Sequence, residues 1–425
     1  MNSTVSGSAS WSSPVYPLPV FSNDRQTKET LCSSCGLCQV RAWPSKESFQ
    51  SCVFELGWLG EQETAVFGRA RDADNLDEAR FGITRQRFVA KLKQPIAGAQ
   101  WSGIMTHLSL KALDAKLVDA VVTLHRSKAD FFIPEPALAM TNADVLAARG
   151  SKPVISPVLK SLETAYQKGV KKLLVIGASC HIHVMRDFQR RFPYLKDVEI
   201  YALGIPCVDN IKPKKLRWIL EKLSRSHQTV VYYEFMQDFT VHLRHENGDL
   251  EKVPYFSLPQ ELSRIDLFAP SCTSCFDYLN SLADMTVGYI AAPLVGEEKR
   301  QWVMVRTEKG DALLKLIQDD LDVFPETAAG DAKKGLKKLI PHLKKLVEQN
   351  PDNVKAGRKI PIWIGKLLAA LAYRSGPRGI EFAKHSVDYH LIRNYFFVKK
   401  NYPEKLTTLV PKHVYRLLKE YDLEA

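Results

Sequence analysis

The sequence predicts an α/β fold with a largely parallel central sheet, a cysteine-bearing segment before it and a helical appendage after it. In the central part of the chain, short apolar runs typical of strands alternate with segments of helical periodicity. This order is typical of a parallel sheet with crossover helices. We expect the strands at residues 118–124, 173–177, 198–203 and 230–235, and the helices at residues 104–117, 158–168, 181–192 and 215–223.

Shifts in composition divide the chain into four parts. Residues 1–30 are rich in Ser, Asn, Pro and Thr and are expected to form a flexible tail. Residues 31–95 form an irregular cysteine-bearing segment, residues 96–330 form the α/β core, and residues 331–425 form a Lys-rich helical region. A chain of 425 residues with 45% hydrophobic and 25% charged residues can bury a large core, which excludes wholesale disorder.

The chain is basic, with 59 Lys and Arg residues against 47 Asp and Glu residues and a formal net charge of +12. This surplus indicates an acidic partner, which the charge alone leaves open between nucleic acid, an anionic membrane surface and an acidic protein such as a small electron carrier. The first residues lack the basic and apolar regions of a secretory signal, and no apolar run is long enough to span a bilayer. We therefore expect the protein to stay inside the cell.

The first four cysteines have the spacing of a metal-cluster site. Cys32, Cys35 and Cys38 form a C-x2-C-x2-C motif, and Cys52 follows fourteen residues later. Three thiolates in one tight loop can bind three irons of a 4Fe-4S cluster, whereas a structural zinc site, the alternative, usually takes two separated C-x2-C pairs. Gly36 suits a loop whose backbone must turn and direct amides at cluster sulfurs. The sequence thus predicts an N-terminal iron-sulfur segment.

The other four cysteines form a second set. Cys180 and Cys207 each follow a predicted strand, and Cys272 and Cys275 form a C-x2-C turn. If the two strands are parallel, both thiols emerge at the carboxyl edge of the sheet, where α/β folds gather their sites. Burial as ordinary apolar residues is a reasonable alternative for Cys180 or Cys207 alone. Eight cysteines in two sets of four predict two clusters.

Five motifs give the chain a resemblance to a known family. The motifs are CSSCGLC at residues 32–38, GAQWSG at 98–103, PCVDN at 206–210, YEFMQD at 233–238 and PSCTSCFDY at 270–278. With these motifs the sequence resembles the beta-subunit family of deazaflavin-reducing hydrogenases, and within it the branch that contains ferredoxin-dependent divinyl chlorophyllide 8-vinyl reductase and 7-hydroxymethyl chlorophyll a reductase.

The resemblance implies an enzyme with FAD, two 4Fe-4S clusters and reduced ferredoxin as electron donor. It implies reduction of a chlorophyll-type pigment, first of all the 8-vinyl group of divinyl chlorophyllide, in the cytoplasm or plastid stroma. Reduction of the 7-hydroxymethyl group of chlorophyll is an alternative, and a non-catalytic electron-transfer subunit is another. A basic surface for an acidic ferredoxin would account for the charge, and no nucleic acid is expected.

The turn at residues 98–103 is the candidate flavin site. A Gly-rich turn that opens a helix offers free amides and a positive dipole end to a pyrophosphate. Such turns are commonplace, so it is the resemblance that favours flavin binding here. The candidate flavin-binding residues are Gly98, Gln100, Trp101, Ser102, Gly103, Arg149 and Ser156.

Three residues are candidate proton donors. His181 and His183 follow Cys180 directly, so that one of them could face the flavin as a general acid, although hydrogen bonding near a cluster would use the same residues. Asp238 is a candidate only through its motif.

Two C-terminal segments raise the question of membrane contact. The Lys-rich segment 333–345 and the apolar segment 360–373 could together lie on an anionic bilayer that holds a lipophilic pigment. The sequence favours a plainer arrangement, in which the first is a solvated helix and the second a helix docked in the core.

Overall fold

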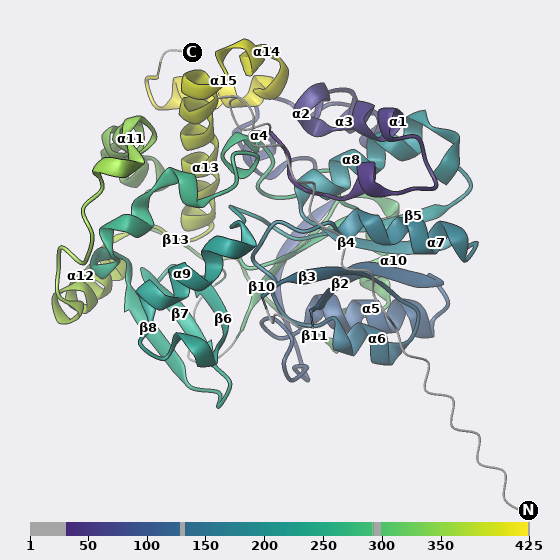
Figure 1. Ribbon diagram of the computed structural model, residues 1–425, viewed down its shortest axis with the longest axis horizontal. Coiled ribbons are helices and arrows are strands. Elements are labelled where there is room, and N and C mark those ends of the chain that lie inside the picture. Colours follow the sequence, from purple (N-terminus) through teal and green to yellow (C-terminus); the bar gives the residue numbers. More distant parts are fainter. Residues whose placement is uncertain (1–30, 128–131, 291, 293–298, 424–425) are drawn as a thin grey trace, which may run out of the picture. The chain divides into compact units, whose positions relative to one another are not determined.

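The computed structural model describes residues 31–423 except 128–131, 291 and 293–298, and Figure 1 shows its elements. The tail predicted at residues 1–30 lies outside the described residues. From Leu31 onward the chain forms one compact unit.

A large sheet lies at the centre of this unit. Its eight strands follow the order β11-β1-β10-β9-β5-β4-β2-β3. The pairs β2–β4, β4–β5 and β5–β9 are parallel, whereas β3 at one edge and β10, β1 and β11 at the other edge pair antiparallel. The predicted parallel sheet is confirmed for its centre. The strands are β1 (Gln86–Leu92), β2 (Ala120–Arg126), β3 (Pro134–Ala139), β4 (Lys172–Gly177), β5 (Glu199–Gly204), β9 (Met285–Gly288), β10 (Gln301–Val305) and β11 (Leu321–Phe324).

Helices cover both faces of the large sheet. Leu173 and Leu174 are adjacent in β4 and belong to two different apolar clusters, because successive strand residues point to opposite faces. One cluster includes α8 (Ser179–Arg191), and the other includes α5 (Ile104–Asp114) and α10 (Glu308–Lys315). The predicted helix at 158–168 is a 3-10 turn followed by α7 (Leu162–Gln167), and α6 (Asn142–Ala147) follows β3.

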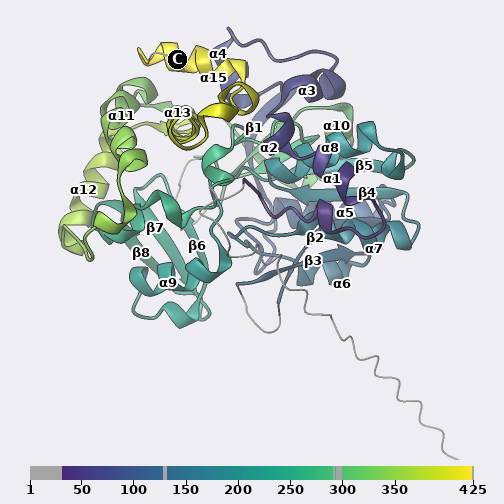
Figure 2. The same ribbon diagram turned by 45° about the horizontal axis from the view of Figure 1, so that its top comes forward.

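The strand predicted at residues 230–235 is present, but it does not belong to the large sheet. It is β6 (Val230–Phe235) of a separate antiparallel sheet with β7 (Thr240–His245) and β8 (Leu250–Pro254). This sheet has its own apolar cluster with α9 (Pro213–Leu223). Both figures show it beside the large sheet (Figures 1 and 2).

The N-terminal segment packs onto the unit rather than folding alone. Its apolar side chains Trp43, Phe54 and Trp58 are at most 3% exposed and share one cluster with the large sheet. The segment predicted to end at residue 95 also includes β1, which lies inside the large sheet. Its helices are α1 (Ser45–Gln50), α2 (Val53–Leu56), α3 (Gly60–Phe67) and α4 (Leu76–Phe81).

The predicted C-terminal helical region is confirmed. Asp388, which is fully buried, accepts hydrogen bonds from Arg80 at 2.8 Å and from the Tyr421 hydroxyl at 2.6 Å, so three distant segments meet at this carboxylate. None of the helices in the described ranges is long and apolar enough to cross a bilayer. The helices are α11 (Ala332–Glu348), α12 (Ile362–Ser375), α13 (Ile380–Asn401), α14 (Leu406–Leu409) and α15 (Lys412–Glu420).

Candidate active site

The first cysteine set lies in a tight loop on the N-terminal segment. The 3-10 turn Leu37–Gln39 begins after Gly36, whose φ of 89° is in the left-handed region. A Cβ at Gly36 would lie 2.8 Å from the Pro157 carbonyl oxygen, so only glycine fits both the backbone conformation and the close approach. Cys32 and Cys38 are exposed in this loop.

The second set lies at the carboxyl edge of the parallel strands, as predicted. β4 and β5 pair in parallel up to Gly177 and Gly204, and Cys180 and Cys207 follow these strand ends. The four cysteines of this set line one cavity. Its lining also includes Ser33, Ile155, Ala178, Ser179, His181, Val208, Asn210 and Ser271.

The two cysteine sets adjoin each other. Ser33, from the first loop, lines the cavity of the second set and hydrogen-bonds Cys180. Cys180 also interacts electrostatically with Cys32 and Cys35. A group held by one set would therefore be a neighbour of a group held by the other.

Burial raises the pKa of thiols in both sets and so favours their protonated form at neutral pH. Burial raises the pKa of Cys52 and Cys180 to about 11 and that of Cys272 to about 12. Because the thiolate is the form that binds metal, metal binding here must release protons, and the positive charge of the metal must offset the cost of burying the thiolates. Backbone amides already point at sulfur: Ser34 N lies 3.3 Å from Cys32 Sγ, and Asn210 N lies 3.3 Å from Cys272 Sγ.

Neither set forms a ready-made site for a single metal ion in the described part of the chain. Among the residues that the structure describes, no three His, Cys, Asp or Glu side chains converge as ligands of one ion. Thiols that share a cavity without converging are compatible with a multi-iron cluster, in which each thiolate binds a different iron.

Helix α13 holds the loop of the second set. The Asn394 side chain donates to the carbonyl oxygens of Cys272 at 2.9 Å and Cys275 at 2.7 Å, and His390 Nε2 donates to Cys275 O at 3.0 Å. Arg393 forms a buried bidentate pair with Asp209, two residues after Cys207, at 2.7 and 2.8 Å. The sequence analysis missed these residues because nothing local in a helix indicates which distant loop it touches.

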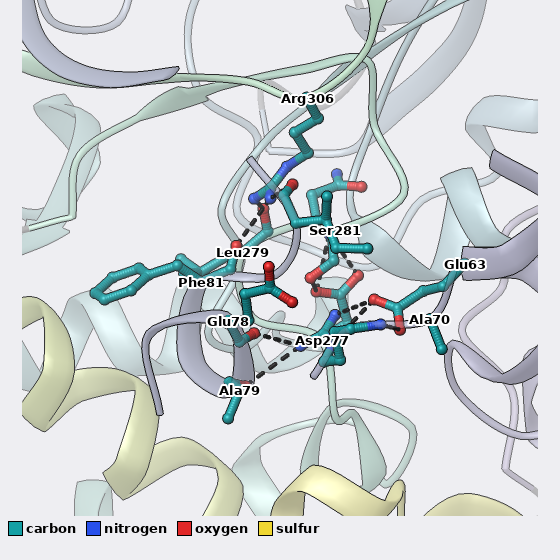
Figure 3. Close-up of polar contacts among 12 residues, drawn as sticks. Glu63, Ala70, Glu78, Ala79, Phe81, Asp277, Leu279, Ser281 and Arg306 are labelled. Carbon is teal, nitrogen blue, oxygen red and sulfur yellow. Dashed lines mark hydrogen bonds and ion pairs between the residues drawn. The ribbon is translucent and has the colours of Figure 1, made fainter. Parts of the chain in front are cut away.

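The two predicted histidines have different surroundings. His181 lines the cavity, and burial lowers its pKa to about 4. His183 is fully buried, and its Nε2 lies 2.9 Å from Asp277 Oδ2. Asp277 also accepts from the amide and hydroxyl of Ser281, and Figure 3 shows the two residues beside Glu63 and Arg306. His183 thus belongs to a buried polar network behind Cys275 and not to the cavity lining.

The Gly-rich turn has the predicted position before a helix. Gly103, with φ of 94°, is the N-cap of α5 and leaves the first amides of that helix without a side-chain cap. Ser102 is buried and binds the sheet instead, because its Oγ accepts from Leu92 N at 3.1 Å and donates to the Gln301 side chain at 3.3 Å. Trp101 stacks on Tyr289 with ring centroids 4.6 Å apart.

Basic residues surround this turn. A Cβ at Gly98 would lie 2.8 Å from Arg149 Nε, which places the predicted Arg149 directly against the turn. Burial and the nearby Arg126 lower the pKa of Lys152 to about 7, and burial lowers the pKa of Arg126 to about 10. An anion bound among these cations would reverse both shifts, so the group fits a phosphate-bearing ligand. Ser156, by contrast, hydrogen-bonds His181 through its backbone, beside the cysteine cavity.

Glu234 in β6 is a candidate that the sequence analysis did not single out. Its carboxylate accepts from Gln100 of the turn at 3.0 Å and from the hydroxyl of Tyr232. Burial raises the pKa of Glu234 to about 7, although these hydrogen bonds lower it. The alternation of β6 could have indicated an inward Glu, but not its partner across the fold.

The pKa of Asp238 is shifted in the opposite direction to that of Glu234. Burial acts to raise its pKa, but hydrogen bonds from His242 and Thr240 outweigh it and lower the pKa to about 2. Asp238 Oδ2 lies 2.8 Å from His242 Nε2. An acid that is ionised at neutral pH has no proton to donate, so Glu234 is better suited than Asp238 to that role.

Comparison with known proteins gives the same assignment as the motifs. Residues 87–163 match the sequence profile "Coenzyme F420 hydrogenase/dehydrogenase, beta subunit N-term", and residues 170–327 match the corresponding C-terminus. The chain belongs to the coenzyme F420 hydrogenase/dehydrogenase beta-subunit family. The family's C-terminal part includes the whole second cysteine set, and its N-terminal part includes the Gly-rich turn. The first cysteine set and the helices α11–α15 lie outside the matched parts.

Relatives extend the match over nearly the whole chain. An uncharacterized protein of Nostoc sp. is 41% identical over 94% of this chain and 96% of its own length. The chloroplastic 7-hydroxymethyl chlorophyll a reductase of rice is 36% identical over 92% of this chain and 82% of the rice protein. A chain of the F420-reducing [NiFe] hydrogenase complex of Methanosarcina barkeri shares the fold, with a TM-score of 0.55, 21% identity, and coverage of 78% of this chain and 97% of that chain.

Proposed function

We propose that the chain is an iron-sulfur flavoprotein that reduces a chlorophyll-type tetrapyrrole with electrons from reduced ferredoxin. The observation that carries the proposal is the pair of adjoining cysteine sets in a family member whose rice relative is a chlorophyll reductase. Because that relative is chloroplastic, the plastid stroma or the cytoplasm of a photosynthetic cell is the proposed location.

Each cysteine set is proposed to hold one 4Fe-4S cluster, with Cys32, Cys35, Cys38 and Cys52 on one and Cys180, Cys207, Cys272 and Cys275 on the other. Such clusters would transfer electrons singly between a carrier and a flavin. The fit rests on the thiol-only donor sets, the amides directed at sulfur and the support from α13. The exposed Cys32 and Cys38 make the first set the proposed entry point for ferredoxin, since an electron donor must come close to a cluster.

FAD is proposed to bind at the Gly-rich turn. Bound FAD would collect two electrons for transfer to the substrate. The cations Arg126, Arg149 and Lys152 would receive its phosphates, with the open N-terminus of α5.

Glu234 is the proposed proton donor. It lies against Gln100 of the turn, and its pKa near 7 allows it both to hold and to release a proton at neutral pH. The Tyr232 hydroxyl donates to the same carboxylate oxygen of Glu234 as Gln100 does, and it can orient the carboxyl group.

The substrate is proposed to be the 8-vinyl group of divinyl chlorophyllide. Two electrons and two protons convert this vinyl group to an ethyl group. The second candidate is the 7-hydroxymethyl group of chlorophyll a, which the rice relative favours. There, two electrons and two protons give a methyl group and one water.

Anaerobic turnover with reduced ferredoxin and a panel of divinyl and 7-hydroxymethyl pigments tests the proposal. We expect one pigment to be reduced, with product analysis identifying the changed group. Reduction of no pigment by protein that carries both clusters and FAD would favour a non-catalytic electron-transfer subunit instead.

Substitution of Lys152 by Met tests the FAD site. Lys152 Nζ donates to the carbonyl oxygens of Ala148 and Gly150, so the substitution would remove a positive charge near the proposed phosphate site. We expect FAD affinity to fall about tenfold or more, because the attraction between this charge and the phosphates is lost. Flavin content after gel filtration measures the loss of affinity. Lys152→Arg should restore FAD binding. Lys168→Met, at an exposed lysine, is the control. Full FAD content in Lys152→Met would place the phosphates elsewhere.

A further inference from the structure

Helix α12 turns its large apolar side chains outward. Trp363 is 71% exposed, Leu367 57%, Leu371 52% and Ile362 44%. Three of these residues recur at intervals of four, so they form one stripe along the helix. Such a contiguous exposed apolar stripe indicates an interaction site.

The inner face of α12 is made of small residues. Its buried positions are Gly365 and Ala369. A Cβ at Gly365 would lie 1.9 Å from Ser257 Oγ, and this hydroxyl donates to Pro361 O at 3.0 Å, so the helix is fixed by its small side. The sequence analysis expected this helix to dock in the core; it does dock, but its large apolar side chains stay outside. The helix docks through glycine and alanine, because the loop beneath it leaves no room for larger residues.

The net charge of the protein lies in two C-terminal segments, which include α11 and α12. Residues 332–347 and 354–379 each contain six Lys or Arg residues and no Asp or Glu. The rest of the chain then holds 59 − 12 = 47 cationic residues against 47 acidic ones, so these two segments account for the whole formal charge of +12. The lysines of α11 at 333, 334, 337, 338, 344 and 345 are exposed.

We infer that α11 and α12 form a docking surface for an anionic lipid bilayer, with the stripe of α12 in the headgroup region and the lysines at the lipid phosphates. An exposed Trp beside aliphatic residues, surrounded by cations, is the pattern of a helix that lies on a membrane. Each Lys or Arg near an anionic membrane surface contributes about 1 kcal/mol of attraction, or about fivefold in affinity. The cations would therefore supply a large part of the binding free energy.

Two other occupants fit less well. A symmetric pairing of two copies through this face would bring the cations of both copies together, which is repulsive. In both views α12 lies away from α1–α3, and α1 contacts the turn of the first cysteine set, so a ferredoxin on this surface would be far from Cys32 and Cys38 (Figures 1 and 2). The inference stands without the proposed reaction, although a lipophilic substrate would give the docking a use.

Flotation with vesicles tests the inference on the full-length holoprotein. We expect binding to vesicles of phosphatidylglycerol and phosphatidylcholine, and little binding to phosphatidylcholine alone. Trp363→Ser with Leu367→Ser, and separately Lys334→Gln with Lys338→Gln, should each weaken binding about tenfold or more. These two lysines are chosen because Lys333 and Lys337 contact Glu420 and Asp422.

Matched controls separate the surface from general effects. Leu250→Ser changes an apolar residue that is 43% exposed on another element, and Lys168→Gln with Lys171→Gln removes two exposed lysines elsewhere. Both should bind vesicles like the unmodified protein. Trp363→Phe should retain binding while losing the blue shift of tryptophan emission that vesicles cause.

Equal binding of the serine variant and the unmodified protein would overturn the inference. Equal binding to neutral and anionic vesicles would do so too. The inference would also be overturned if the unmodified protein were an oligomer and the serine variant a monomer, since the stripe would then join copies of the chain. Pigment reduction in detergent is unaffected by any of these outcomes, so failure here leaves the proposed function to its own test.

Discussion

Replacing Cys35 by serine is expected to remove about four of eight irons and about four of eight sulfides per chain, and to abolish ferredoxin-dependent turnover. Cys35 lies between two other cysteines of the first loop, and burial raises its pKa well above the usual value. Serine has no sulfur, so at this position it would leave one iron of the proposed cluster without a thiolate. Iron and sulfide analysis of anaerobically purified protein, with EPR of the reduced form, measures the loss. FAD content should stay near one per chain.

The reciprocal variant makes the assignment decisive. Cys207→Ser should remove the other half of the iron and spare the first set. Because Ser33 and Cys180 bring the two sets together, loss of both clusters in a folded Cys35→Ser protein would show that the sets share ligands. Stoichiometric zinc without sulfide would show that neither set holds iron.

The positions of the cysteine-bearing loops could be predicted from sequence because each signal is local. Cys32, Cys35 and Cys38 lie within one turn of chain, and Cys180 and Cys207 follow strands whose apolar runs are plain. Parallel pairing then brings the two strand ends to one edge, which the structure confirms. The antiparallel flanks of the sheet could not be predicted in this way, because pairing of β1 with β10 and β11 joins residues more than 200 positions apart.

The contacts that complete the site depend on long-range packing. Asn394 donates to the carbonyls of Cys272 and Cys275 from a helix whose sequence gives no sign of this role. In α12, periodicity shows which residues share a face but not which face is buried. The close approach of Ser257 to Gly365 decides that, and it places Trp363 in solvent. Sequence patterns thus locate ligand-bearing loops better than they locate the residues that support them.

Replacing Glu234 by Gln is expected to lower pigment reduction about 100-fold or more while leaving iron and FAD content unchanged. Glutamine preserves the shape and accepts the hydrogen bonds from Gln100 and Tyr232, but it has no proton to donate. Single-turnover reduction of the pigment should fall above about pH 7 in the unmodified protein, where Glu234 loses its proton, and this dependence should disappear in the variant. Glu251→Gln, on β8 of the same small sheet, is the matched control.

The same substitution has a second, structural readout. Burial raises the pKa of Glu234 from 4.5 to about 7, so the folded protein holds this proton more tightly than the unfolded chain. The stability that this gives is fully present below about pH 4.5 and is lost as the pH rises to about 7. The melting temperature of Glu234→Gln relative to the unmodified protein should therefore increase between pH 5 and pH 8. Two other groups near Glu234, Tyr232 and Tyr289, have pKa values raised by burial and stay protonated throughout this range. A relative melting temperature that is independent of pH, together with full turnover in Glu234→Gln, would remove Glu234 from the reaction and leave His181 as the remaining candidate on the cavity wall.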